Sequence, residues 1–167
     1  MSPRAPSPDR LIDVTVVLLG RALPSTSIAP IEIFSSAGTL WQELRGEAPA
    51  PRFRVRTVTI DGKATRPLMP LTLQPQGAFT DGRRTDLIVL SASGLDPRSP
   101  TENAPLIPWL RRWHARGATI AGVCSGVSLL AETGLLDGKI ATTHWALADQ
   151  FRQRYPKVRW QADRLIT

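Results

Sequence analysis

The sequence has little cysteine and no long apolar run. Cys124 is the single cysteine among 167 residues, which excludes an internal disulfide framework and a metal site built from several thiolates. No apolar run approaches the ~18 residues needed to span a membrane, and the best, residues 14–19, has only the length of a strand. No apolar core of a signal peptide follows the first ten residues. We therefore expect a cytoplasmic protein that makes no membrane contact and holds no metal ion.

Lysine is also scarce, so arginine supplies most of the positive charge. The 21 basic residues outnumber 14 acidic ones, for a formal net charge of +7, and only three of the basic residues are lysine. Such an excess favours polyanionic partners through long-range attraction, but a genome-wide preference for arginine would produce the same count. Charge alone leaves nucleic-acid binding open. The 42% hydrophobic and 21% charged residues are ordinary for a globular domain.

Two kinds of segment alternate along the chain. Residues 1–10, rich in proline, are expected to form a flexible tail, and residues 11–167 a single domain. Apolar segments predict strands at residues 11–19, 53–60, 71–73, 86–90 and 118–123. Helical spacing predicts helices at residues 30–44, 104–116, 125–133 and 146–155. Because strands alternate with helices, we predict an α/β fold whose sheet is mainly parallel, with helices on both faces.

The first helix boundary is predicted from proline. Pro30 suits the first position of a helix, where a missing backbone amide costs nothing. We therefore expect the helix to begin at Pro30 and residues 20–29 to form a loop. Further along, Gly117 and Gly134 are suited to end two later helices.

Three arginines alternate with apolar residues in the second predicted strand. Arg52, Arg54 and Arg56 are separated by Phe53 and Val55, so the arginines share one face of the strand. A solvated edge strand protected by charge explains this pattern well. A row of arginines that binds phosphate is the less favoured alternative.

The segment Gly122-Val123-Cys124-Ser125-Gly126 is the most informative part of the sequence. A nucleophile between two glycines, where a strand passes into a helix, is typical of a nucleophile elbow, because small flanking residues allow a sharp turn. The amino end of the following helix would favour the thiolate of Cys124 over the thiol. The alternative is a buried structural cysteine beside two packing glycines.

Twenty residues later, His144 lies in the segment Ala141-Thr142-Thr143-His144-Trp145. One helix and a returning strand fit in that interval, so the imidazole can reach the sheet edge that carries Cys124. A neighbouring histidine acts as a general base or stabilises a thiolate. Without further information, a structural histidine would be the commoner interpretation. The other histidine, His114, is expected at the surface with no role.

Residues 118–145, ATIAGVCSGVSLLAETGLLDGKIATTHW, resemble the core signature of the ThiJ/PfpI superfamily, which has the class I glutamine amidotransferase-like fold. The LLDG and ATTHW parts are similar to the N-terminal domains of GlxA-type AraC-family regulators and to isocyanide hydratases. Residues 28–38, 85–94 and 151–160 extend the resemblance over most of the chain. It implies a flavodoxin-like sandwich with Cys124 at the elbow, His144 beside it, and a homodimer.

The sequence departs from the family pattern at two points of the site. Family enzymes carry a carboxylate four residues before the helix-opening proline, where this chain has Thr26, and a hydroxyl cannot act as an acid or base near neutral pH. The nearest acid, Glu32, is better explained as a first-turn carboxylate that the helix dipole favours. The family's Gly-Gly pair is replaced by Ala92 and Ser93, whose amides could still line an oxyanion site.

Three functions remain open. We favour a ligand- or redox-sensing domain of an AraC-type regulator, in which a small molecule binds near Cys124 and His144 without any cofactor. DNA would be contacted only by a C-terminal domain, since the family continues beyond Thr167 and the chain is expected to be truncated there. The alternatives are a cysteine enzyme of the isocyanide hydratase, amidase or deglycase kind, and a scaffold with an inert cysteine. The expected ligand pocket comprises Thr26, Glu32, Ala92, Ser93, Ser125 and Trp145.

Overall fold

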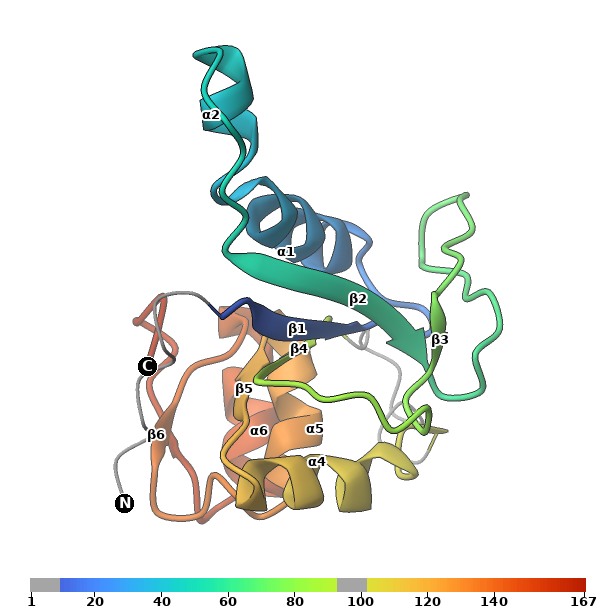
Figure 1. Ribbon diagram of the computed structural model, residues 1–167. Helices are drawn as coiled ribbons and strands as arrows, with labels where there is room; N and C mark the ends of the chain where they lie inside the picture. The colour runs from blue at the N-terminus through green and yellow to red at the C-terminus, as the bar shows by residue number, and fades with distance from the viewer. Residues whose placement is uncertain (1–9, 93–101) are drawn as a thin grey trace.

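Five parallel strands form the central sheet of the protein. A computed structural model describes residues 10–92 and 102–167 (Figure 1). The strand order is β3-β2-β1-β4-β5, and every neighbouring pair is parallel. The strands are β1 (Ile12–Val17), β2 (Phe53–Thr59), β3 (Gly77–Ala78), β4 (Leu87–Leu90) and β5 (Thr119–Gly122). A separate parallel pair joins β6 (Ile140–Ala141) to β7 (Arg159–Trp160).

Helices lie on both faces of this sheet, as the alternation of segments predicts (Figure 1). One face is covered by α1, and the opposite face by α4 and α5. The helices are α1 (Ser25–Ser36), α2 (Leu40–Leu44), α4 (Leu106–Ala115), α5 (Val127–Glu132) and α6 (Ala148–Arg154), with short 3-10 turns at Cys124–Gly126 and Trp145–Leu147. The predicted α/β fold with a mainly parallel sheet is confirmed.

The side chains on the two faces of β1 belong to two separate hydrophobic cores. Val14 and Val16 are fully buried in the core that includes α1. Val17 is fully buried in the opposite core, which also includes Leu110 of α4. Because a buried valine contributes roughly 1.5–3 kcal/mol, a strand that is apolar on both faces is held at the centre of the sheet. This explains why the nearly continuous apolar run at residues 11–19 forms the middle strand.

The predicted strand at residues 71–73 is wrong. Leu73 forms only an isolated antiparallel bridge with Thr65, and the third strand of the sheet is β3. The free edge of β2 accepts the later segment instead, because the amides of Gln76 and Phe79 donate to the carbonyls of Thr57 and Thr59. Hydrogen bonding to an open edge therefore decided which short segment became a strand.

The predicted start of the first helix is also wrong. The helix begins at Ser25 and has Pro30 in its interior, so residues 25–29 are helical rather than a loop. The turn before it satisfies the first free amides, since the amides of Ser27 and Ile28 donate to the carbonyl of Pro24. One missing amide at Pro30 does not outweigh this turn and the packing of α1 on the sheet.

The same predicted helix is divided in two by Gly38. Its φ of 82° lies in the left-handed region, and a Cβ at this position would collide with the carbonyl oxygen of Ala50. Only glycine meets both conditions without strain. Residues 30–44 therefore form the end of α1 and the separate short helix α2, which extends away from the sheet in Figure 1.

Candidate functional site

Cys124 lies two residues after the end of β5, at the carboxyl end of the sheet. The amide of Val123 donates to the carbonyl of Leu90 over 2.9 Å, so the sheet ladder continues to the residue before the cysteine. Cys124 then adopts a φ of 55°, a left-handed conformation that costs a non-glycine residue on the order of 1 kcal/mol. Its thiol is free and half-buried. The chain thus turns sharply at the cysteine and continues into α5.

Two glycines allow this turn. A Cβ on Gly126 would collide with the carbonyl oxygens of Leu90 and Ser91, and one on Gly122 would collide with the backbone of Val127. The backbone on both sides of Cys124 therefore packs against its neighbours more closely than any side chain permits. Ser125, placed in the ligand pocket by sequence reasoning, is 3% exposed, so it is largely closed to a ligand.

The segment that carries His144 contacts the Cys124 turn. The hydroxyl of Thr143 donates to the carbonyl oxygen of Cys124 over 3.5 Å. Nδ1 of His144 accepts from the amide of Ala146 over 3.2 Å, so a neutral imidazole carries its proton on Nε2. The ring of Trp145 lies 5.3 Å from the imidazole, tilted by 30°. Both rings are exposed to solvent, and they follow directly after Thr143, the residue that contacts the cysteine turn.

An ion pair and a phenol connect the two helices that follow Cys124 and His144. Glu132, at the end of α5, accepts from Arg154 over 2.9 Å and from the Tyr155 hydroxyl over 2.7 Å. Burial raises the pKa of Tyr155, and the hydrogen bond and charge of Glu132 raise it further. These contacts tie α5 to α6, and so help to set the distance between the cysteine turn and the histidine segment.

The hydroxyl of Thr26 is hydrogen-bonded to a backbone amide that the sequence predicted to face the site. The amide of Ala92 donates to the Thr26 hydroxyl over 2.9 Å, and that hydroxyl donates to the carbonyl of Leu23 over 2.6 Å. Ala92 is 1% exposed. Its amide is thus committed to the threonine, although the sequence assigned it to an oxyanion site. Ser93, its expected partner, lies outside the described residues.

Glu32 is not a first-turn carboxylate. Because α1 begins at Ser25, Glu32 is the eighth residue of the helix and is exposed. It lies six residues beyond Thr26, roughly 9 Å further along the helix axis. The dipole explanation for this residue is therefore wrong, and the described contacts do not connect Glu32 to Cys124 or His144.

Sequence reasoning missed Ser91, which joins β1 to β4 at this end of the sheet. Its fully buried hydroxyl donates to the carbonyl of Val17 over 3.0 Å and accepts from the amide of Leu19 over 3.3 Å. A polar residue directly after an apolar strand was the available signal. The bond satisfies backbone groups where the ladder between the two strands ends.

A cavity of about 300 Å³ lies at the carboxyl ends of β1 and β2. Its lining includes Gly20, Thr59, Asp61, Lys63 and Glu102, but neither Cys124 nor His144. Within residues 10–92 and 102–167, no cluster of three or more histidine, cysteine or acidic side chains is arranged to hold a metal ion. No helix in that part of the chain has the length and apolar character to cross a membrane.

The strand order β2-β1-β4-β5, with helices on both faces, defines a flavodoxin-like α/β domain. Residues 29–167 match the DJ-1/PfpI family. The chain belongs to this family.

The relatives of this chain include both regulators and an enzyme. It is 33% identical over 109 residues to the HTH-type transcriptional regulator CdhR of Pseudomonas aeruginosa. The aligned region covers 65% of this chain and 32% of the regulator. It is 36% identical over 80 residues to the isonitrile hydratase of Pseudomonas putida, which covers 47% of the chain and 34% of the hydratase. The chain thus spans about a third of these relatives.

Among solved structures, an AraC family transcriptional regulator from Pseudomonas putida has the same fold. The two superpose with a TM-score of 0.71 at 20% sequence identity, over 90% of this chain and 76% of the other. At this identity the likeness shows the fold.

Proposed function

We propose that this domain is the ligand- or redox-sensing domain of an AraC-type transcription regulator, active in the cytoplasm, with DNA bound by a separate domain. The observation that carries the proposal is the hydrogen bond from the Ala92 amide to Thr26. In place of a proton-transferring carboxylate, the site has a hydroxyl that is already used to hold α1 against the end of β4. The regulator CdhR supports the same interpretation.

Cys124 is the sensing group in this proposal. Its thiol is free and half-buried. Thr143 contacts the cysteine turn, and the exposed side chains of His144 and Trp145 come directly after Thr143 in the sequence. A small molecule bound there would contact the thiol and both rings. Alternatively, a hydroperoxide would transfer one oxygen atom to the thiolate, which yields the sulfenic acid and an alcohol or water.

A homodimer would use the apolar surface of α1 and α2. Ile33 is 65% exposed, Trp41 64% and Leu44 73%. Exposed large apolar side chains on neighbouring helices favour an interaction site, and α2 extends beyond the sheet in Figure 1. Size-exclusion chromatography with light scattering should show a dimer that Trp41→Glu converts to a monomer, while Trp145→Glu, a change at another exposed tryptophan, leaves it intact.

The second candidate is a cysteine enzyme. The left-handed conformation of Cys124 and the similarity to isonitrile hydratase favour it. Such chemistry requires a proton donor as well as a nucleophile, and general acid–base help is worth about 10²–10⁴-fold. Thr26 cannot give that help near neutral pH.

One set of assays separates the two functions. Isocyanide, glyoxal and small amides are offered to the wild type, to Thr26→Glu and Thr26→Asp, and to Cys124→Ser. We expect no enzyme-like turnover by the wild type and a gain of activity confined to the carboxylate variants. Turnover by the wild type that Cys124→Ser abolishes would overturn the sensor proposal.

Redox sensing is tested on the same protein. Mass spectrometry after mild peroxide treatment should find one added oxygen on Cys124, which dithiothreitol removes. If the cysteine stays unmodified, the redox form of the proposal is excluded and ligand binding remains.

A further inference from the structure

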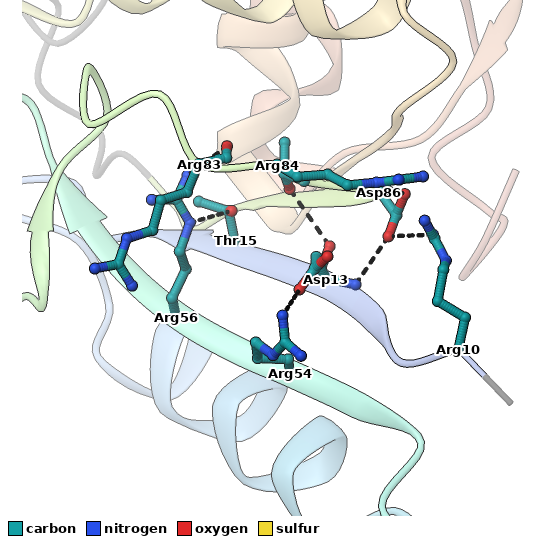
Figure 2. A network of polar contacts seen from close by, with 9 residues as sticks. Arg10, Asp13, Thr15, Arg54, Arg56, Arg83, Arg84 and Asp86 are labelled. Atoms are coloured by element: carbon teal, nitrogen blue, oxygen red, sulfur yellow. Dashed lines mark hydrogen bonds and ion pairs between the residues drawn. The ribbon is translucent and has the colours of Figure 1, made fainter.

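A second concave surface lies away from the cysteine, over the beginning of β1, most of β2 and the start of β3. Its volume is about 490 Å³, and four arginines and two aspartates are among its lining residues. These charged residues are Asp13, Arg54, Arg56, Asp81, Arg83 and Arg84. We name this surface the arginine groove. It lies on the face of the sheet opposite α1, because Phe53 and Val55 pack toward α1 and the alternating arginines point away (Figure 2).

Most charges around the groove are paired. Arg54 bonds Asp13 at 3.3 Å, and Asp86, at the margin, accepts from Arg84 at 3.3 Å and from Arg10 at 2.6 Å. These pairs join β1, β2 and the segment that leads into β4. They explain the positions of Arg54 and Arg84 without a ligand.

Arg56 and Arg83 differ from Arg54 and Arg84 in the partners of their guanidinium groups. Nε of Arg56 donates to the hydroxyl of Thr15 over 3.0 Å, and its Nη2 donates to the carbonyl oxygen of Arg83 over 3.4 Å. Both acceptors are neutral. Within the described part of the chain, neither arginine forms an ion pair, and Figure 2 shows them side by side, away from Asp86.

The surroundings of Arg56 are unfavourable for its charge. Burial lowers the pKa of Arg56, and the positive charge of Arg83 lowers it further, against the weaker opposing effects of Asp81 and Asp13. A half-buried guanidinium beside a second one is normally compensated by an anion. Asp81 forms no ion pair with either arginine within the described residues, and its Oδ2 accepts from the amide of Ala78.

We infer that the arginine groove binds a phosphate group, either as free phosphate or on a small phosphorylated molecule. A phosphate offers three or more acceptor oxygens and close to two negative charges. It can therefore contact Arg56 and Arg83 at once, while a planar carboxylate matches a single guanidinium. The volume of about 490 Å³ suits a small molecule, whereas a nucleic acid would need a longer basic surface. This site is separate from the proposed sensing site at Cys124.

Isothermal titration tests the inference with inorganic phosphate and with glycerol 3-phosphate, at ionic strength held constant with sodium chloride. We expect saturable binding by the wild type and affinity lower by about tenfold in Arg83→Gln. Arg112→Gln, which removes an exposed arginine outside the groove lining, should bind within about twofold of the wild type. A stronger response to glycerol 3-phosphate than to phosphate would identify an organic phosphate as the ligand.

Because Arg56 is half-buried, its role is tested with a conservative substitution. Arg56→Lys keeps the charge but removes the fork of donors, so it should weaken phosphate binding by about tenfold while circular dichroism shows an intact fold. Absence of saturable binding below about 10 mM phosphate would overturn the inference. Equal losses in Arg83→Gln and Arg112→Gln, equal affinity for succinate, or displacement of phosphate by duplex DNA at lower concentration would also overturn it.

Discussion

Thr26→Val tests the contact on which the proposed function depends. Valine has nearly the shape of threonine but no hydroxyl, so it removes the acceptor of the Ala92 amide. The carbonyl of Leu23 loses a donor but still accepts from the Thr26 amide over 3.0 Å. The principal cost is therefore one buried backbone amide without a partner, because Ala92 is 1% exposed.

An unsatisfied buried donor costs about 1–3 kcal/mol. For a domain of this size each kcal/mol lowers the melting temperature by about 2–4 °C, so Thr26→Val should melt roughly 2–12 °C below the wild type. Urea unfolding followed by tryptophan fluorescence gives the free energy directly.

Two variants control this measurement. Thr26→Ser keeps the hydroxyl and should lose less than about 1 kcal/mol. Thr39→Val removes a hydroxyl that only donates to the carbonyl of Ser35 at an exposed position, and should lose less than about 0.5 kcal/mol. If Thr26→Val is as stable as the wild type, or Thr26→Ser loses as much, the hydrogen bond to Ala92 does not hold α1 on the sheet.

Three further predictions concern stability. Gly126→Ala should lower the free energy of unfolding in urea by about 3 kcal/mol or more, because its methyl would collide with two carbonyl oxygens. The control Gly20→Ala, whose methyl would make only an ordinary contact, should cost about 1 kcal/mol or less. Equal losses would contradict the close packing at Gly126. Burial raises the pKa of Asp86, but bonds from Arg10 and the Asp13 amide and the nearby arginine charges outweigh it, so the pKa is lowered. Its stabilisation is present above the unfolded pKa, about 3.9, and is lost as the pH falls through the lower folded value; Asp86→Asn should therefore flatten acid unfolding below about pH 4, and an unchanged profile would contradict this. The pKa of Tyr155 is raised, so its contribution to stability has the opposite dependence on pH. The stabilisation is fully present below the unfolded pKa of about 10 and is lost as the pH rises toward the higher folded value. Tyr155→Phe should remove that alkaline loss and cost about 1–2 kcal/mol at neutral pH, and a profile identical to the wild type would refute it.

Local sequence patterns were sufficient for the main elements. The apolar run at residues 11–19 contains the central strand β1, because burial on both faces favours apolar residues at most positions, with Asp13 and Thr15 as the polar exceptions. The turn at Cys124 was readable from its two glycines, because their lack of a Cβ is the physical requirement of that turn. The Thr143 contact agrees with the expectation that the His144 segment returns to the cysteine edge.

Other features depended on contacts between distant residues. Pro30 suited a helix start locally, but the turn before Ser25 and the packing of α1 moved the start five residues earlier. The hydrogen bond between Thr26 and Ala92 spans 66 residues, and no local pattern encodes such a partner.

The alternating arginines of β2 show the same division between sequence and structure. Their spacing by itself determined that Arg54 and Arg56 share a face, since side chains alternate along any strand. Only the folded chain decided what that face meets: β1 places Asp13 beside Arg54 and Thr15 beside Arg56, and the segment before β4 brings Arg83 to the same groove. Periodicity is a local property of the backbone, whereas charge compensation depends on residues that folding alone brings together.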